Sequence, residues 1–139
     1  MAKRDAVFPA NPHALFAEHR YSPAIRAGGL LFVSGQVGAR NDGSPEPDTE
    51  AQIRLAFDNL VAILEAAGCT FADVVDTTLF MIDPDRDFET LMKVLPDYWG
   101  EAPYPTLTGV GVNWLAGFRF EVKVVAQLPQ GEPLQGSPA

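Results

Sequence analysis

The sequence predicts a single α+β domain with the element order β-β-α-β-α-β-β. Two stretches place apolar residues at the three- and four-residue spacing of a helix. The other apolar stretches are short, rich in β-branched residues and bounded by glycine or proline, as strands are. The 139 residues are one domain's length, and 47% of them are hydrophobic. Such a chain can bury its own core without a disulfide or a metal.

The first predicted element is a β-hairpin over residues 21–36. The segment up to Pro12 has little periodicity and is expected to be an arm. Within the hairpin, a short strand at 20–25 leads to a tight turn at Gly28-Gly29. The second strand, 30–36, is apolar and partly β-branched.

The first predicted helix follows a polar loop at 41–47. Asp48 or Thr49 can cap its N-terminus, and Glu50 suits the positive end of the helix dipole. Gly68 is placed to end it. Its apolar stripe consists of Ile53, Phe57, Leu60, Leu64 and Ala67.

A strand at 74–82 and a second helix are predicted next. Asp83-Pro84-Asp85 ends the strand, and the acidic run that continues to Asp87 is expected to be a solvated helix start. Pro96 should end or kink the helix. The apolar stripe of this helix consists of Phe88, Leu91, Met92, Leu95 and Trp99.

Two further strands, 106–114 and 118–128, complete the predicted fold, with a turn at Gly117. The core is expected to span about 20–129, and residues 130–139, rich in proline, glycine and serine, are expected to be a flexible tail.

The predicted sheet should carry both helices on one face, because strand-helix-strand connections are right-handed. On the last strand, Phe120, Val122 and Val124 suit the helix side, and the opposite face is of mixed polarity. A partly apolar face without a cover usually packs against another subunit, so a closed cyclic oligomer is expected.

Composition narrows the function classes. The net charge of −8 and the absence of a Lys/Arg cluster disfavour a nucleic-acid partner. No apolar run is long enough for a membrane span, and no signal-peptide pattern begins the chain, so a cytoplasmic location is expected. Cys69 is the only cysteine, and His13 and His19 are too isolated to suggest a metal site. No cofactor-binding fingerprint is present.

Several segments, in the right order, resemble the RidA (YjgF/RutC) family. They are the Tyr-Ser-Pro-Ala segment that begins at Tyr21, the second strand at 31–36, Pro103-Tyr104-Pro105, and Phe120-Glu121-Val122. The similarity runs from about Tyr21 to Pro129. Residues 17–22 and 111–118 resemble the YjgH-type branch of the family.

The resemblance implies a chorismate-mutase-like fold and a homotrimer with small-metabolite clefts between subunits. Active members of the family hydrolyse enamines and imines to 2-keto acids and ammonia, without metal or cofactor. In them an arginine holds the substrate carboxylate and a glutamate positions or activates water.

Glu121 matches the family's glutamate and is the candidate catalytic residue. The alternative is an interface carboxylate paired with Arg119 or Lys123. Tyr21 and Ser34 match residues of the family's cleft, where Ser34 could donate a hydrogen bond to a ligand, and Gly35 is a further candidate for the site. The alternatives are a packed hairpin tyrosine for Tyr21 and a small residue beside Gly35 for Ser34.

Leu107 stands where the family has its arginine, and Thr108 follows it. Leucine cannot form the bidentate contact that a guanidinium forms with a carboxylate. Arg119 or Arg20 could replace this cation, although a solvated or salt-bridged arginine is the ordinary alternative for both. Trp114 could line the cleft or simply be packed.

Three functions remain open from the sequence. The first is a trimer that binds a small metabolite and has lost or altered the deaminase chemistry. The second is an active hydrolase of enamines or imines that uses Glu121 and water. The third, a ribonuclease, is disfavoured by the acidic charge.

Overall fold

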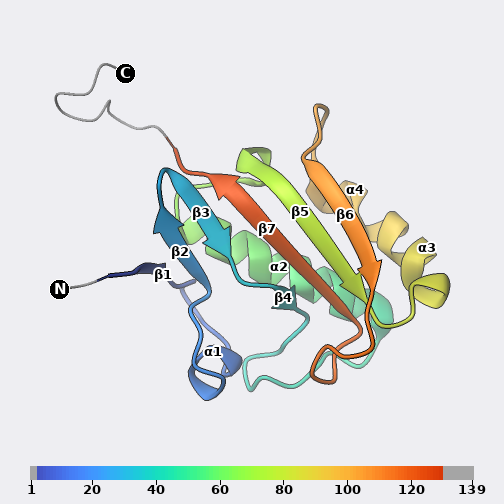
Figure 1. The fold of residues 1–139 in the computed structure, drawn as a ribbon. Coiled ribbons are helices and arrows are strands. Elements are labelled where there is room, and N and C mark those ends of the chain that lie inside the picture. Colours follow the sequence, from blue (N-terminus) through green and yellow to red (C-terminus); the bar gives the residue numbers. More distant parts are fainter. Residues whose placement is uncertain (1–2, 130–139) are drawn as a thin grey trace, which may run out of the picture.

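The computed structural model describes residues 3–129, so the predicted tail at 130–139 lies outside the described residues. These residues form one mixed sheet covered by helices on one side (Figure 1). The strand order is β1-β2-β3-β7-β5-β6, with β4 also paired to β7. β6 runs parallel to β5, and the other pairs are antiparallel. The strands are β1 (Asp5–Val7), β2 (Ala24–Ala27), β3 (Leu30–Val33), β4 (Gln36–Val37), β5 (Val74–Met81), β6 (Thr106–Gly111) and β7 (Phe120–Gln127).

The predicted α+β class is confirmed, and α2 is the main helix against the sheet (Figure 1). The Asp48 side chain caps α2 by accepting a hydrogen bond from the Ala51 N–H at 3.0 Å. Gly68, with φ of 77°, follows its end, as predicted. The helices are α1 (Leu15–Glu18), α2 (Thr49–Ala66), the 3₁₀ turn η1 (Phe71–Asp73), α3 (Pro84–Val94) and α4 (Pro96–Trp99).

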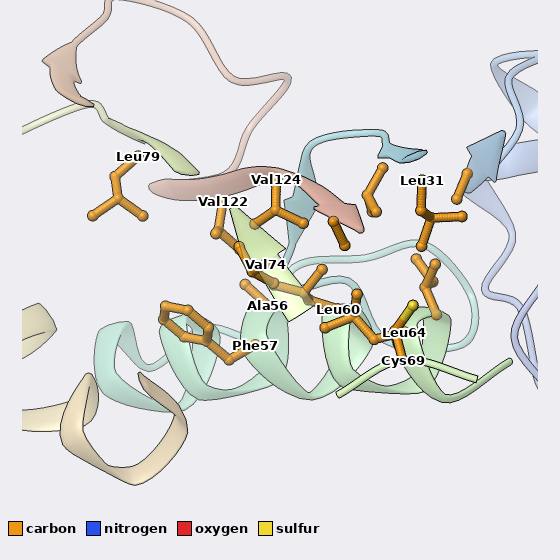
Figure 2. Packing of buried hydrophobic residues seen from close by; sticks show 14 of the residues in the cluster. Leu31, Ala56, Phe57, Leu60, Leu64, Cys69, Val74, Leu79, Val122 and Val124 are labelled. Carbon is orange, nitrogen blue, oxygen red and sulfur yellow. The ribbon is translucent and has the colours of Figure 1, made fainter. Parts of the chain in front are cut away.

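The core lies between α2 and the sheet (Figure 2). Phe57, Leu60 and Leu64 of α2 pack toward Val122 and Val124 of β7. Because alternate residues of β7 are buried here, Glu121 and Lys123 face the uncovered side of the sheet.

That uncovered side has the mixed polarity expected from the sequence. Ile25, Phe32 and Val125 form an apolar region on neighbouring strands. Lys123 and Thr78 lie further along, side by side on β7 and β5.

The predicted strand 30–36 is divided into β3 and β4 at Ser34-Gly35. Phe32 is opposite Val125 and Gln36 is opposite Val122, so four steps on one side match three on β7. The Ser34 N–H donates to Pro23 O, and its hydroxyl donates to Ser22 O. The extra residue between β3 and β4 acts as a β-bulge, which changes the direction of the side chains near Ser34 and Gly35.

Two elements before residue 20 have no counterpart in the sequence prediction. β1 pairs with β2 at the edge of the sheet, and α1 buries Phe16 against the core. Segments of three or four residues are too short to display a period, so the sequence predicted neither the strand within the arm up to Pro12 nor the helix after it.

The second helical region also differs from its prediction. The helix ends before Pro96, as expected, and Pro96 begins the short α4, but Phe88 and Met92 of the apolar stripe are exposed. Asp87 is buried rather than solvated.

β6 ends at Gly111, three residues before the predicted end at 114. No helix within residues 3–129 combines the length and apolar character that crossing a bilayer requires.

Candidate functional site

A cavity of about 310 Å³ lies where the Ser34-Gly35 bulge meets β7. Tyr21, Ser34, Gly35 and Glu121 line it, together with Trp114 from the loop before β7. One subunit therefore brings together five of the eight residues predicted for the site.

Glu121 points its carboxylate into this cavity from the uncovered face of β7. It lies opposite Val37 of β4 and Phe80 of β5. Within residues 3–129 its carboxylate has no hydrogen bond or ion pair. Burial raises the pKa of the Glu121 carboxyl above its ordinary value, and the charge of Lys123 opposes part of that rise. A half-buried carboxylate without a partner is typical of a functional site.

Tyr21 stands beside Glu121 and is half-buried. Its ring packs edge-on against Phe16, with the ring centres 5.1 Å apart. Burial raises the pKa of the Tyr21 hydroxyl, and the Glu121 charge raises it further. The hydroxyl is therefore held in its protonated form, in which it can donate a hydrogen bond to a ligand.

Ser34 takes a different role from the one predicted. Its hydroxyl donates to Ser22 O at 2.7 Å, so that hydrogen is not directed at the cavity. In this arrangement the Ser34 oxygen can accept a hydrogen bond from a ligand or a water.

The remaining wall of the cavity is largely apolar. Trp114 lines the cavity and is 73% exposed within one subunit. Ala116 and Gly117 have φ of 55° and 95° and form the turn that follows it. Sequence reasoning missed Leu15, His19 and Val37, which also line the cavity. His19 does fall in the 17–22 segment that resembles the YjgH-type branch.

Arg119 does not join this group. Its Nε and Nη2 donate to Asp87 Oδ2 at 3.1 and 2.9 Å, and its backbone N–H donates to the Gln52 side chain. Alternation along the strand placed Arg119 beside Glu121, but its side chain turns to α3. The salt-bridged alternative describes it, and it is not a lining residue of the cavity.

Leu107 and Thr108 lie on β6, separated from β7 by β5. Leu107 is opposite the buried Thr77 and so faces the helix side, where it lines a separate cavity of about 370 Å³. Thr108 is opposite Thr78 on the uncovered face. Within one subunit, neither residue reaches the cavity that Glu121 lines.

No cluster of three His, Cys, Asp or Glu side chains suited to a metal ion occurs between residues 3 and 129. His13 is buried and stacks on Phe16, with ring centres 4.1 Å apart. The polar side chains that line the Glu121 cavity are therefore a carboxylate, a phenol, a hydroxyl and the imidazole of His19.

Comparison with known proteins identifies close relatives. The family model described as Endoribonuclease L-PSP matches residues 11–128. The chain is 61% identical to the RutC family protein YjgH of Escherichia coli K12, over 94% of this chain and 99% of that protein. It is 32% identical to the putative reactive intermediate deaminase TdcF of the same organism, over 76% of this chain and 84% of TdcF.

Solved structures of related proteins have a similar fold. Protein YJGH has a TM-score of 0.89 and 61% identity, with 92% of this chain and 98% of that chain covered. RidA from the Antarctic bacterium Psychrobacter sp. PAMC 21119 has a TM-score of 0.80 and 29% identity, with 90% and 100% covered.

Proposed function

Since the chain belongs to the RutC (RidA/YjgF) family, we propose that it binds a small metabolite in clefts between the subunits of a homotrimer. We further propose that the 2-imino acid deaminase chemistry is lost or altered. The observation that carries the proposal is the half-buried Glu121 carboxylate, unpaired within residues 3–129, in a cavity that Tyr21 and Ser34 also line.

The trimer is supported by what one subunit leaves uncovered. Within residues 3–129 one face of the sheet has no helix over it, and all six residues of β6 are exposed at the sheet edge. Leu107 and Thr108 lie on that edge, two strands from Glu121. A cleft that unites them with Tyr21, Ser34 and Glu121 requires β6 of a second subunit, which a closed cyclic arrangement supplies.

The altered chemistry is supported by charge. Leu107 stands at the family's arginine position, and no Lys or Arg is among the described residues that line the Glu121 cavity. Arg119, a possible substitute, is paired with Asp87. A 2-imino acid carboxylate would therefore lack its bidentate partner at this position.

A specific observation also favours an active hydrolase of enamines or imines. The raised pKa of Glu121 makes the carboxylate a stronger base toward water than an ordinary glutamate is. Glu121 would accept a proton from a water as that water adds to the imine carbon, and would return the proton to the imine nitrogen. A second proton, from the hydroxyl of this adduct, passes to the same nitrogen as the C–N bond breaks, which releases ammonia and leaves the 2-keto acid.

The nuclease activity in the family model's name is not part of the proposal. The chain carries a net charge of −8, which repels a phosphate backbone.

The two candidates are separated by generating 2-iminobutyrate in situ and measuring 2-oxobutyrate release. If the protein binds but does not hydrolyse, neither the wild type nor Glu121→Gln accelerates release. Acceleration that Glu121→Gln abolishes would instead establish the hydrolase. Leu107→Arg is the complementary variant, and a gain of activity in it would show that only the carboxylate anchor is missing. Sedimentation of the purified protein as a monomer would contradict the trimer.

A further inference from the structure

A second hollow, of about 600 Å³, shares two lining residues, Tyr21 and Ser34, with the Glu121 cavity. The second hollow differs in charge, because Arg4 and Arg20 also line it. One ligand that passes Tyr21 and Ser34 could therefore contact guanidinium groups at one end and the Glu121 carboxylate at the other.

The two arginines are distinguished from the other cations by their lack of partners. Among residues 3–129, neither Arg4 nor Arg20 has a hydrogen bond, an ion pair or an electrostatic interaction with another described group. Arg40 bonds Ser44, and Lys123 interacts with Glu121. Lys3 also has an interaction, and five further cations of the described residues form ion pairs: Arg26, Arg54, Arg86, Lys93 and Arg119.

Two guanidinium groups without carboxylate partners line the same hollow. The chain has 18 acidic and 10 basic side chains, so carboxylate partners are abundant. Two cations beside one hollow repel each other, and an anion bound in that hollow reduces the repulsion.

The backbone at Arg20 adds a second observation. Arg20 has a φ of 60°, in the left-handed region that residues other than glycine rarely adopt. Such strain persists where the surrounding structure requires it, and it is common at ligand-binding sites. Here it occurs at the residue directly before Tyr21, and the Tyr21 N–H donates a hydrogen bond to Phe16 O.

We infer that Arg4 and Arg20 form an anion-binding subsite next to the Glu121 cavity, which takes the carboxylate or phosphate group of a small ligand. The inference rests on the proposed function, and it names the ligand class: a small anion whose far end reaches Glu121. The positive charge for the ligand would then come from Arg4 and Arg20, and not from position 107, where the family has its arginine.

The subsite can be tested by NMR titration of the intact protein with three probes. 2-Oxobutyrate carries a carboxylate, butanone is a related ketone without charge, and inorganic phosphate tests the other anion. The variants are Arg4→Gln, Arg20→Asn and the double variant, because asparagine tolerates the left-handed backbone better than most residues. Lys93→Gln is the matched control, since it removes one positive charge on α3, where Lys93 pairs with Glu50.

We expect 2-oxobutyrate to shift the resonances of Tyr21, Ser34 and Glu121. The double variant should bind it about tenfold more weakly or worse, as expected for the loss of a charged contact. Butanone binding should be unchanged in every variant, and Lys93→Gln should behave as the wild type. Arginine-dependent binding of phosphate in preference to 2-oxobutyrate would also support the subsite and would identify phosphate as its anion.

Two results would overturn the inference, and only the second would also contradict the metabolite-binding proposal. If the double variant binds both anions as tightly as the wild type while the Glu121 cavity still responds, only the arginine subsite is wrong. If no probe shifts Tyr21, Ser34 or Glu121 in the wild type, the metabolite-binding proposal fails with it.

Discussion

The carboxylate of Glu121 occupies the space that a β-carbon on Gly35 would need. A Cβ built on Gly35 would lie 2.8 Å from Glu121 Cγ and would overlap the carboxylate itself. Gly35 is not at a positive φ, so a side chain is excluded there by Glu121 rather than by the backbone. The glycine is therefore what permits the glutamate to lie in the half-buried wall of the cavity.

Gly35→Ala should consequently displace the Glu121 carboxylate toward solvent. Because burial is the main cause of the raised pKa of Glu121, this pKa should fall toward 4.5 in the variant. Carboxyl-detected NMR titration measures it directly. Gly109→Ala, on β6 with nothing within 4 Å of the added carbon, is the matched control and should leave the Glu121 pKa unchanged. An unaltered pKa in Gly35→Ala would contradict the steric argument.

Tyr21 and Glu121 should be coupled electrostatically. Removing the charge in Glu121→Gln makes the tyrosinate less unfavourable, so the pKa of Tyr21 should fall. It should remain above its ordinary value of 10, because burial is the larger cause of its rise. Tyrosine ring resonances followed across the alkaline range report this change. Tyr98, whose pKa is raised to about 12 by burial and by Asp58, is an internal reference that should not move.

Much of the fold could be predicted from the sequence, because long elements carry a period. The α2 stripe and the alternation of β7 placed Phe57 in the core and Glu121 on the opposite face, as observed. β1, α1 and the break at Ser34 could not be predicted in this way, since they depend on contacts between distant segments such as Ser34 with Pro23.

The candidate site was predictable in part for a similar reason. Motif resemblance identified Tyr21, Ser34 and Glu121, which share one cavity. The alternation of residues along a strand correctly indicates the face of the sheet on which a side chain lies at its Cβ atom. It does not indicate which partner the end of a long side chain reaches. Arg119 illustrates the difference, because its guanidinium reaches Asp87 on α3.

The Arg119–Asp87 pair should contribute to stability. The side chains are 27% and 3% exposed, so removing one partner leaves a largely buried charge without its main counterion. We expect Arg119→Met to lower the free energy of unfolding by about 3 kcal/mol, the lower end for a buried pair because Arg119 is partly solvated. Urea denaturation at neutral pH measures the loss. Lys93→Gln, which breaks an exposed pair with Glu50, should cost less than about 1 kcal/mol. Equal losses in the two variants would show that burial does not strengthen the pair.

His13 should make stability depend on pH. Burial lowers its pKa below 6.5, and its Nδ1 accepts a hydrogen bond from the Leu15 N–H, which protonation of that nitrogen would remove. The unfolded chain then binds a proton more readily than the folded one, so this contribution to stability is complete above about pH 6.5 and is lost as the pH falls below it. Urea denaturation between pH 8 and pH 5 should show the wild type losing stability relative to His13→Gln. The exposed His19 gives the control, because His19→Gln should retain the full decline. A wild type and a His13→Gln variant with parallel pH profiles would show that His13 is not responsible.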